Sequence, residues 1–349
     1  VYNTTLDRQE GSNESENYRL SARWDISDTV NITASSTHID QNYNLGQFQV
    51  QTATDEQFQL MQFYDDQVER NPKDFQSSQD FAPQAPQKGE KHDISVNFEW
   101  WEHEFSLINS LSGITEVSET DLDFSPIPLL YFLNGEDYRQ TSHELRIVSP
   151  LGMLDGKLDY VGGIYYAESD TDIQVIIDAA PEPADLLAGL AANNGLGGGD
   201  IAATTVAGQG PGERLFIESF QRGTSTALYG QASWHFTDAF NMTIGLRYSK
   251  EKKSVFQQQD LDSGPTDTPG PVFTQAVMAE EYTLDKTRVD ESISPKFAIG
   301  WEATDNITTY ASIAAGFKSG GFSGSAVRAE IAEVEPESST TYEIGTKMR

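Results

Sequence analysis

The chain has 349 residues, and its 54 acidic and 23 basic side chains give a formal net charge of −31. So few basic groups exclude nucleic-acid binding through phosphates and disfavour docking on an anionic membrane surface, so no nucleic-acid partner is predicted. Cysteine is absent, which excludes thiolate catalysis, Cys-ligated zinc and disulfides. Only 37% of the residues are apolar, against about 45–50% in an ordinary globular protein. A protein wall that is one residue thick and surrounds a polar interior needs no larger share of apolar residues.

Two predicted strands joined by a tight turn open the chain. Apolar residues occupy every second position from Tyr18 to Ile26, and the alternation returns from Val30 to Ala34. A period of two predicts β-strands with one apolar and one polar face. The polar segment that follows, 42–89, is long for a connection, and its middle part, 56–69, predicts a short helix.

The rest of the chain repeats this unit. Alternation predicts further strands, with connections between them, at 92–101, 105–111, 139–149, 157–172, 226–236, 240–249, 293–301, 307–318 and 340–348. Residues 183–193 predict one or two turns of helix inside a long loop. No run of 18 apolar residues occurs, so no transmembrane helix is predicted.

A tryptophan recurs beside three of the short turns. Trp24, Trp234 and Trp301 are each followed by two residues, then Ser or Thr, then Asp, and the next strand begins with Asn, an apolar residue and Thr. Asp and Asn side chains stabilise tight turns by bonding to the backbone. Tryptophan on the apolar face beside such turns is typical of a membrane interface, where the ring enters hydrocarbon and its N–H reaches the head groups. The alternative is the edge of a soluble sheet's core.

Short and long connections alternate strictly along the chain. The short turns lie near residues 28, 103, 151, 238 and 305, and the long loops are 42–89, 119–137, 173–222, 257–287 and 319–337. In an up-and-down sheet alternate turns point to opposite ends, so every short turn lies at one end and every long loop at the other. This asymmetry is typical of an outer-membrane β-barrel, with short periplasmic turns and long extracellular loops.

These patterns predict an all-β fold, a transmembrane antiparallel up-and-down β-barrel with about twelve strands in this chain. The last predicted strand is expected to be unpaired, and the first residues of the chain do not predict a signal peptide. A large sheet with two open edges would promote aggregation. We therefore expect the chain to be an interior piece of a larger barrel.

Several motifs in the second half resemble the late barrel of TonB-dependent outer-membrane receptors. The segment YASIAAGFKSGGF at 310–322 is followed by a Pro-Glu pair and by TYEIGTK at 341–347, and HELRIVS at 143–149 and YVGGIYY at 160–166 are also similar. The resemblance implies a bacterial outer-membrane location, a barrel of about 22 strands, an N-terminal plug and energy from TonB. Residues 1–349 would then be a partial barrel domain that lacks the plug, the TonB box and the terminal strand.

With the apolar face turned to lipid, the charged residues of the other face line the lumen. They are expected to form salt bridges with one another and with a plug, and a few would line the substrate path. These lumen or plug-contact candidates are Arg19, Arg23, Glu99, Glu144, Arg146, Arg247, Lys296, Lys318, Glu343 and Lys347.

Aromatic residues of the long loops are candidates for stacking on a ligand, although they would equally pack the loops together. These ligand-binding candidates are Phe58, Tyr64, Phe81, Tyr131, Phe132, Phe216 and Phe220. The five scattered histidines give no zinc spacing, and no Gly-x-Ser-x-Gly elbow occurs, so the chain is predicted not to be an enzyme and to hold no catalytic residue, metal or cofactor. The acidic excess is typical of solvated loops, with cation binding as the alternative.

The resemblance implies TonB-energised uptake of a scarce ligand, with an iron–siderophore complex as the first choice and cobalamin or an oligosaccharide also open. The expected partners are outer-membrane lipid, the TonB complex through a missing N-terminal segment, and the ligand itself. A passive porin-like channel and a soluble acidic β-rich carbohydrate-binding module are the alternatives.

Overall fold

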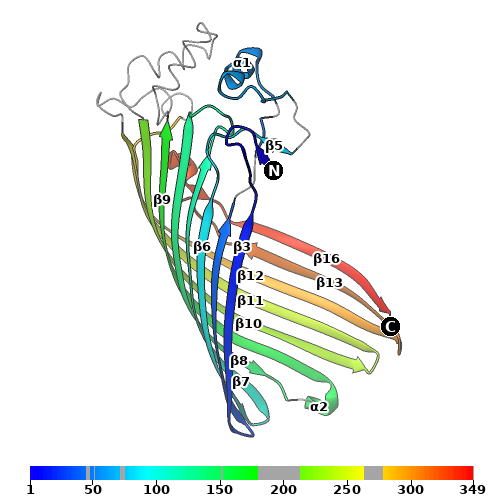
Figure 1. Cartoon of the computed structure of the whole chain (residues 1–349). Coiled ribbons are helices and arrows are strands. Elements are labelled where there is room, and N and C mark those ends of the chain that lie inside the picture. The colour runs from blue at the N-terminus through cyan, green and yellow to red at the C-terminus, as the bar shows by residue number, and fades with distance from the viewer. Residues whose placement is uncertain are drawn as a thin grey trace.

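One antiparallel sheet of eleven long strands makes up most of the molecule (Figure 1). The computed structural model describes residues 1–44, 48–50, 52–70, 75–150, 152–179, 213–262 and 278–348. The strands are β3 (Asn13–Ser27), β4 (Val30–Tyr43), β6 (Ala85–Trp100), β7 (His103–Asp121), β8 (Leu130–Val148), β9 (Leu158–Ala179), β10 (Glu213–Thr237), β11 (Phe240–Asp262), β12 (Tyr282–Thr304), β13 (Ile307–Lys318) and β16 (Glu337–Met348).

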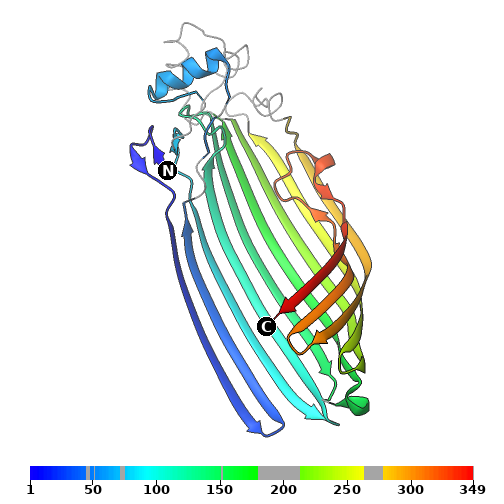
Figure 2. The same ribbon diagram turned by 90° about the vertical axis from the view of Figure 1, so that its right-hand side faces the viewer.

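Each strand of this sheet pairs with its neighbours in the chain, in the order from β3 to β16, which confirms the predicted up-and-down topology. Figures 1 and 2 show a strongly curved sheet with the short turns at the lower end and the long connections at the upper end. The described sheet is not closed, because β3 and β16 are its two edges.

Several strands run further than predicted into the long loops. β9 continues to Ala179, β10 begins at Glu213 and β12 begins at Tyr282, so the predicted loops 173–222 and 257–287 are too long. Near the upper end the outward positions also become polar, as at Asp170 and Arg222. The period-two signal fades there, while backbone pairing between β9 and β10 continues without a break.

Short elements cluster at the upper end of the sheet. They are β1 (Tyr2–Asn3), β2 (Arg8–Gln9), β5 (Gln76–Ser77), β14 (Gly321–Phe322), β15 (Glu333–Val334), the 3-10 turn η3 (Ala329–Ile331) and helix α1 (Asp55–Tyr64). Thr54 and Gln57 form a capping box that starts α1, which confirms a helix near 56–69. The helix predicted at 183–193 lies outside the described residues. At the lower end α2 (Met153–Gly156) fills the turn between β8 and β9.

One face of the sheet exposes its apolar side chains. Leu228 is 60% exposed and Ile293 65%. The strand register aligns a continuous apolar row across six strands, formed by Leu107, Leu145, Ile164, Leu228, Tyr248 and Ile293. Exposing such an apolar surface to water would cost free energy, whereas its contact with lipid is favourable. We call this exposed apolar face the belt.

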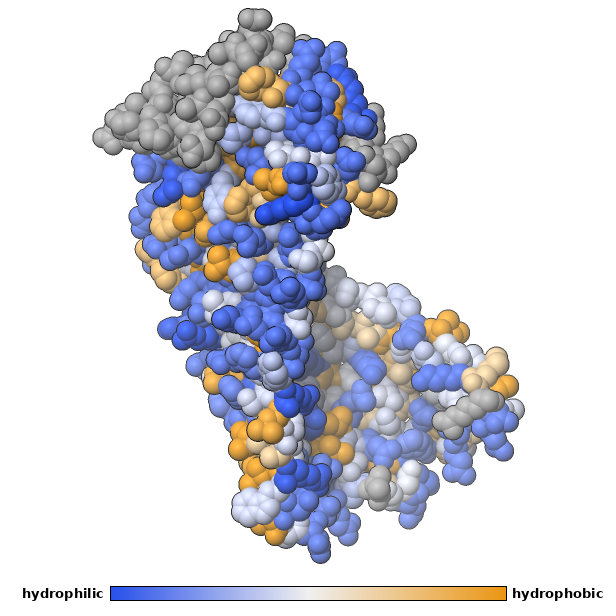
Figure 3. Space-filling view, in the orientation of Figure 1, coloured by the Kyte–Doolittle hydropathy of each residue, from blue (hydrophilic) through white to orange (hydrophobic). Residues whose placement is uncertain are grey.

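The expected aromatic girdle borders the belt at the short-turn end. Trp24 and Trp301 are exposed there, whereas Trp234 is half-buried. Trp100 and Trp101 stack at 4.2 Å beside the β6–β7 turn and extend the girdle. In Figure 3, apolar residues appear at both the upper and the lower end of the molecule. No helix among the described residues has the length and hydropathy needed to cross a membrane.

The buried core lies at the upper end, on the face opposite the belt. Leu215 and Ile217 of β10 are fully buried there with Val175 of β9, and they pack with residues of the upper loops. A second cluster joins Val255 and Leu284 of the wall to Phe322, Ala326 and Ala332. Residues 319–336, which we call the strap, therefore fold onto the inner face of the sheet.

Candidate functional site

The candidate site is the polar inner face of the sheet, opposite the belt. The predicted lumen residues alternate with exposed apolar residues on the same strands; Glu144 and Arg146, for example, flank Leu145. Strand geometry therefore places them on the inner face. Whether they line a substrate path or meet a plug remains a prediction.

Three of these predicted residues meet in one cluster around Tyr229 of β10. The Tyr229 hydroxyl donates to Glu144, which also accepts from Arg146 Nη2 at 2.9 Å. The Arg247 guanidinium lies 5.8 Å from the Tyr229 ring centre and 5.9 Å from that of Tyr165. The cluster links β8 to β11 across the wall by charge-assisted hydrogen bonds and cation–π contacts.

A glycine makes room for this cluster. A Cβ on Gly163 of β9 would lie 2.6 Å from the Tyr229 hydroxyl oxygen and 2.7 Å from the Leu145 carbonyl oxygen. Only hydrogen at this position lets the tyrosine ring lie across the strand. Tyr229 and Tyr165 are not among the predicted lumen residues, although both occupy polar-face positions of predicted strands.

The other predicted lumen residues are dispersed over the sheet. Arg23 pairs with Asp25 at 2.8 Å, Lys296 donates to Gln231 at 3.2 Å, and Glu343 accepts from Tyr310 at 2.6 Å. Lys318 approaches Glu337 at 3.5 Å. Within the described part of the chain, no side-chain partner is found for Arg19, Glu99 and Lys347.

The strap is fixed to the inner wall by hydrogen bonds from wall side chains to strap carbonyls. Lys253 Nζ donates to Gly320 O at 3.0 Å, Gln221 Nε2 to Phe322 O at 3.2 Å, and Gln259 Nε2 to Val327 O at 2.8 Å. These wall residues come from β10 and β11, some 70 to 100 residues earlier in the chain. The strap is therefore part of the wall and narrows the space inside the sheet.

Ion pairs hold the far end of the strap. The Arg288 guanidinium of β12 bonds to Glu333 at 2.9 Å and to Val334 O at 2.9 Å, and it also pairs with Asp290 at 2.9 Å. Lys286 reaches Glu333 at 2.9 Å. A Cβ on Gly320 would overlap the Arg288 guanidinium, so only glycine allows this close approach.

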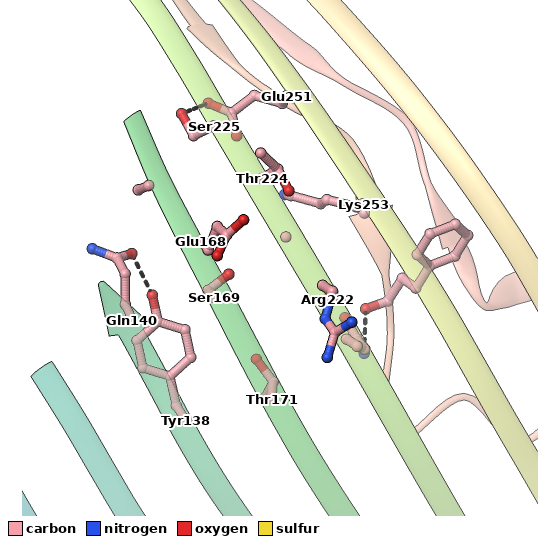
Figure 4. Close-up of a pocket in the computed structure, with 15 residues that line it drawn as sticks. Tyr138, Gln140, Glu168, Ser169, Thr171, Arg222, Thr224, Ser225, Glu251 and Lys253 are labelled. Atoms are coloured by element: carbon pink, nitrogen blue, oxygen red, sulfur yellow. Dashed lines mark hydrogen bonds between the residues drawn. The ribbon is translucent and has the colours of Figure 1, made fainter. Parts of the chain in front are cut away.

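A cavity of about 360 Å³ lies beside the strap, between β8 and β11 (Figure 4). On the inner face, hydroxyl and amide groups, one amine and one carboxylate line this cavity, and Phe322 lines it from the strap. The polar lining residues include Tyr138, Gln140, Ser169, Gln221, Glu251 and Lys253. Ser225 donates to Glu251 at 2.7 Å and Tyr138 to Gln140 at 2.6 Å. These groups suit a polar ligand that forms several hydrogen bonds.

Three carboxyl groups meet in the upper loops. Asp121 is fully buried, and its Oδ1 accepts from the backbone N–H groups of Asp123 and Phe124, both at 2.9 Å. Burial and the negative charges of Asp123 and Asp80 raise the pKa of Asp121 to about 9. Burial, with the charge of Asp123, raises the pKa of Asp80 to about 7. No group of metal-ligating side chains suited to an ion was found in the described ranges.

The predicted loop aromatics fall into separate groups. Phe58 and Tyr64 lie on α1, where the Arg70 guanidinium covers the Phe58 ring at 4.6 Å. Phe81 and Tyr131 meet edge to face at 5.0 Å. Tyr131 and Phe132 belong to strand β8 and not to the predicted loop 119–137, because β8 begins at Leu130. Phe132 packs against the buried core. They do not form one ligand-sized cluster, and their binding role remains a prediction.

The last two predicted loop aromatics, Phe216 and Phe220, belong to strand β10. They alternate with the buried Leu215 and Ile217, so they share the outward face with Leu228. Phe220 is 47% exposed there. Their assignment to a loop is corrected, because β10 begins nine residues before the predicted boundary at 222.

Comparison with known proteins gives a family and a set of similar folds. The family model described as TonB dependent receptor-like, beta-barrel, matches residues 2–349. A search of curated proteins found no match. The ferric yersiniabactin uptake receptor FyuA from Yersinia pestis is similar over 98% of this chain, with a TM-score of 0.66 and 15% sequence identity.

Two more solved structures illustrate the range. The siderophore receptor PiuA from Acinetobacter baumannii is similar over 97% of this chain, with a TM-score of 0.59 and 14% sequence identity. The copper transporter OprC is similar over 100% of this chain, with a TM-score of 0.59 and 11% sequence identity. The chain spans 44% of FyuA, 49% of PiuA and 45% of OprC, less than half of each.

Proposed function

Because the chain belongs to the TonB-dependent receptor β-barrel family and its place is the outer membrane, we propose that it takes part in active uptake of an iron–siderophore complex. The family match over residues 2–349 carries this proposal. A non-enzymatic role agrees with the family, whose members are receptors and transporters. FyuA is described as a ferric yersiniabactin uptake receptor and PiuA as a siderophore receptor, and their similarity supports the choice of ligand.

TonB would supply the energy through a segment outside residues 1–349. We also propose that further strands complete the barrel, because β3 and β16 each lack a second neighbour in the described sheet. Outer-membrane lipid would cover the belt, since its apolar residues are exposed. That belt argues against the alternative of a soluble carbohydrate-binding module.

Iron uptake by a deletion strain tests the proposal. A strain without the gene is expected to lose uptake of radiolabelled iron from at least one ferric siderophore, and the intact gene should restore it. Collapse of the proton gradient should stop the restored uptake, whereas passage through a passive porin would continue. Unchanged uptake from every ferric siderophore tested would refute the proposal.

A further inference from the structure

A groove crosses strands β7 to β10 on the face that carries the belt. It has a volume of about 580 Å³, and apolar side chains of the aligned row line its lower part, among them Leu145, Ile164 and Leu228. At its upper border Asn109 and His143 share the outward face, and Asn109 Oδ1 lies 2.7 Å from His143 Nδ1 in a hydrogen bond. The groove therefore begins in the apolar belt and ends at polar side chains.

A polar pocket lies directly above this groove on the same face. Its volume is about 480 Å³, and outward side chains of β4, β6, β7 and β8 line most of it. Asn109 lines the groove and Leu111 lines the polar pocket, so two residues of β7, about 7 Å of strand, separate them. Groove and pocket together form one site with an apolar lower part and a polar upper part.

Gly113 of β7 leaves the space for the polar pocket. The strand register places it between Glu90 of β6 and Arg139 of β8. A Cβ at this position would meet Glu90 Cγ and Tyr138 O, both at 3.6 Å, which is ordinary contact. The backbone therefore tolerates a side chain here, but that side chain would fill the pocket. Glycine inside a strand often marks a place that a ligand approaches closely.

Two exposed cations flank the polar pocket. Lys88 Nζ lies 3.9 Å from Asp40 Oδ2, which is beyond hydrogen-bonding distance. Arg139 Nε donates to Asp137 Oδ1 at 3.1 Å, and the Arg139 side chain is still 75% exposed. Both cations therefore keep N–H donors for a phosphate, and the carboxylates of Glu90 and Asp137 can accept from hydroxyl groups.

We propose that this site binds one glycolipid of the outer leaflet, with an acyl chain in the groove and a phosphorylated sugar in the polar pocket. The site lies toward the end of the sheet that bears the long loops, the extracellular end of an outer-membrane barrel. The outer leaflet of an outer membrane consists of phosphorylated glycolipid on that side. A pocket of this size suits a sugar, since a lone phosphate would leave most of it empty.

The formal net charge of −31 opposes a general attraction of anionic lipid to the protein. Retention of the glycolipid therefore depends on the two local cations and on the fit of the groove. The inference goes beyond uptake, because it concerns the face of the sheet opposite the polar interior.

Native mass spectrometry tests the site on the full-length receptor, delipidated in detergent and mixed with lipopolysaccharide that carries a minimal sugar core. The unmodified protein is expected to retain one glycolipid. The double variant Lys88→Gln, Arg139→Gln should bind it roughly tenfold or more weakly, because it loses charge-assisted hydrogen bonds to phosphate. Gly113→Val should also weaken binding, by filling the pocket. The matched control is Lys250→Gln, Lys252→Gln, which removes two outward cations of β11 that line neither the groove nor the pocket.

Equal affinity of the unmodified protein and the Lys88→Gln, Arg139→Gln variant overturns the inference, as does an equal loss of affinity in the control. The absence of any retained glycolipid on the unmodified protein overturns it as well. Phosphatidylethanolamine, offered in place of the glycolipid, should be retained more weakly; equal retention would refute the sugar site. Unchanged heat-dependent mobility on gels shows that a variant is folded. If Gly113→Val does not fold, the double variant decides, because its two side chains are exposed.

Discussion

At the scale of single residues, the inner wall depends on close contacts that only certain residues allow. Gly163 is such a position, because Tyr229 crosses it to reach Glu144. Glu144 accepts from both Tyr229 and Arg146, and its side chain is 19% exposed, whereas that of Arg146 is 41% exposed. The partly buried carboxylate makes the geometry around Tyr229 more sensitive to small changes in shape than that of the exposed pairs near the edges of the sheet.

Gly163→Ala is expected to destabilise the protein by about 1–3 kcal/mol, since the added methyl group forces Tyr229 or the backbone of β8 to move. Reversible urea unfolding in detergent measures the change. Gly135→Ala is the control, because a Cβ there meets nothing within 4 Å. Equal losses in the two variants would contradict the role assigned to Gly163.

The buried carboxyl groups of the upper loops predict a pH-dependent stability. Burial raises the pKa of Asp80 to about 7 and of Asp121 to about 9, and it also raises the pKa of Asp123. An acid with a raised folded-state pKa binds its proton more tightly when folded. Its contribution to stability is complete below its ordinary pKa near 4 and is lost as pH rises through 7 and 9.

Hydrogen exchange of residues 76–84 and 121–130 should therefore become faster between pH 6 and pH 9.5, beyond the intrinsic pH effect on exchange. Asp121→Asn removes one of these ionisations and should weaken this dependence, and Asn Oδ1 can still accept from the backbone. Asp28→Asn, in the exposed turn at the other end, should leave it unchanged. Protection that rises with pH in the unmodified protein would contradict the prediction.

At the scale of elements, the strap is distinct because it is a loop that behaves as part of the wall. Its backbone carbonyls accept from side chains of β10 and β11, and its apolar residues complete a buried cluster with Val255 and Leu284. These contacts join residues that lie 67 to 101 positions apart in the chain.

Gly320→Ala tests the docking of the strap. The added methyl group would overlap the Arg288 guanidinium, so the ion pairs to Glu333 and Asp290 must loosen. Limited proteolysis within 319–336 should then become several-fold faster, because local opening costs less free energy. Gly321→Ala should cleave at the original rate, since its Cβ would sit 3.6 Å from Lys253 Nζ.

At the scale of the whole molecule, the two faces of the sheet suit different environments, one apolar and one polar. The belt runs continuously across the sheet through aligned rows, whereas the strap, the cavity and the charged cluster all lie on the other face. A wall one residue thick between lipid and a polar interior explains the low apolar content of 37%. It also explains why exposed leucines are compatible with stability here.

Leu228→Arg places a charge in the middle of the belt and should destabilise the barrel by about 2–4 kcal/mol. Refolding into lipid vesicles and unfolding in denaturant measure this loss. Thr224→Arg lies on the same face of β10, four residues nearer the upper loops, beside Lys252 and Glu168. It should cost about 0–1 kcal/mol. Equal costs at both depths would show that the belt does not face hydrocarbon.

The sequence by itself determined the strand alternation, the sorting of short turns and long loops to opposite ends, and the face on which the predicted lumen charges lie. These features are local, because the alternation of apolar and polar residues and the turn motifs each depend only on residues that are neighbours in the chain. The belt and its exposed tryptophans at 24 and 301 follow from them directly.

Only the tertiary structure decided which inner residues meet. Glu144, Arg146 and Arg247 come together because the register of β8 to β11 brings them beside Tyr229, and no local pattern contains that register. The Gly- and Ser-rich strap resembled a free loop, since the residues that fix it lie far away in sequence.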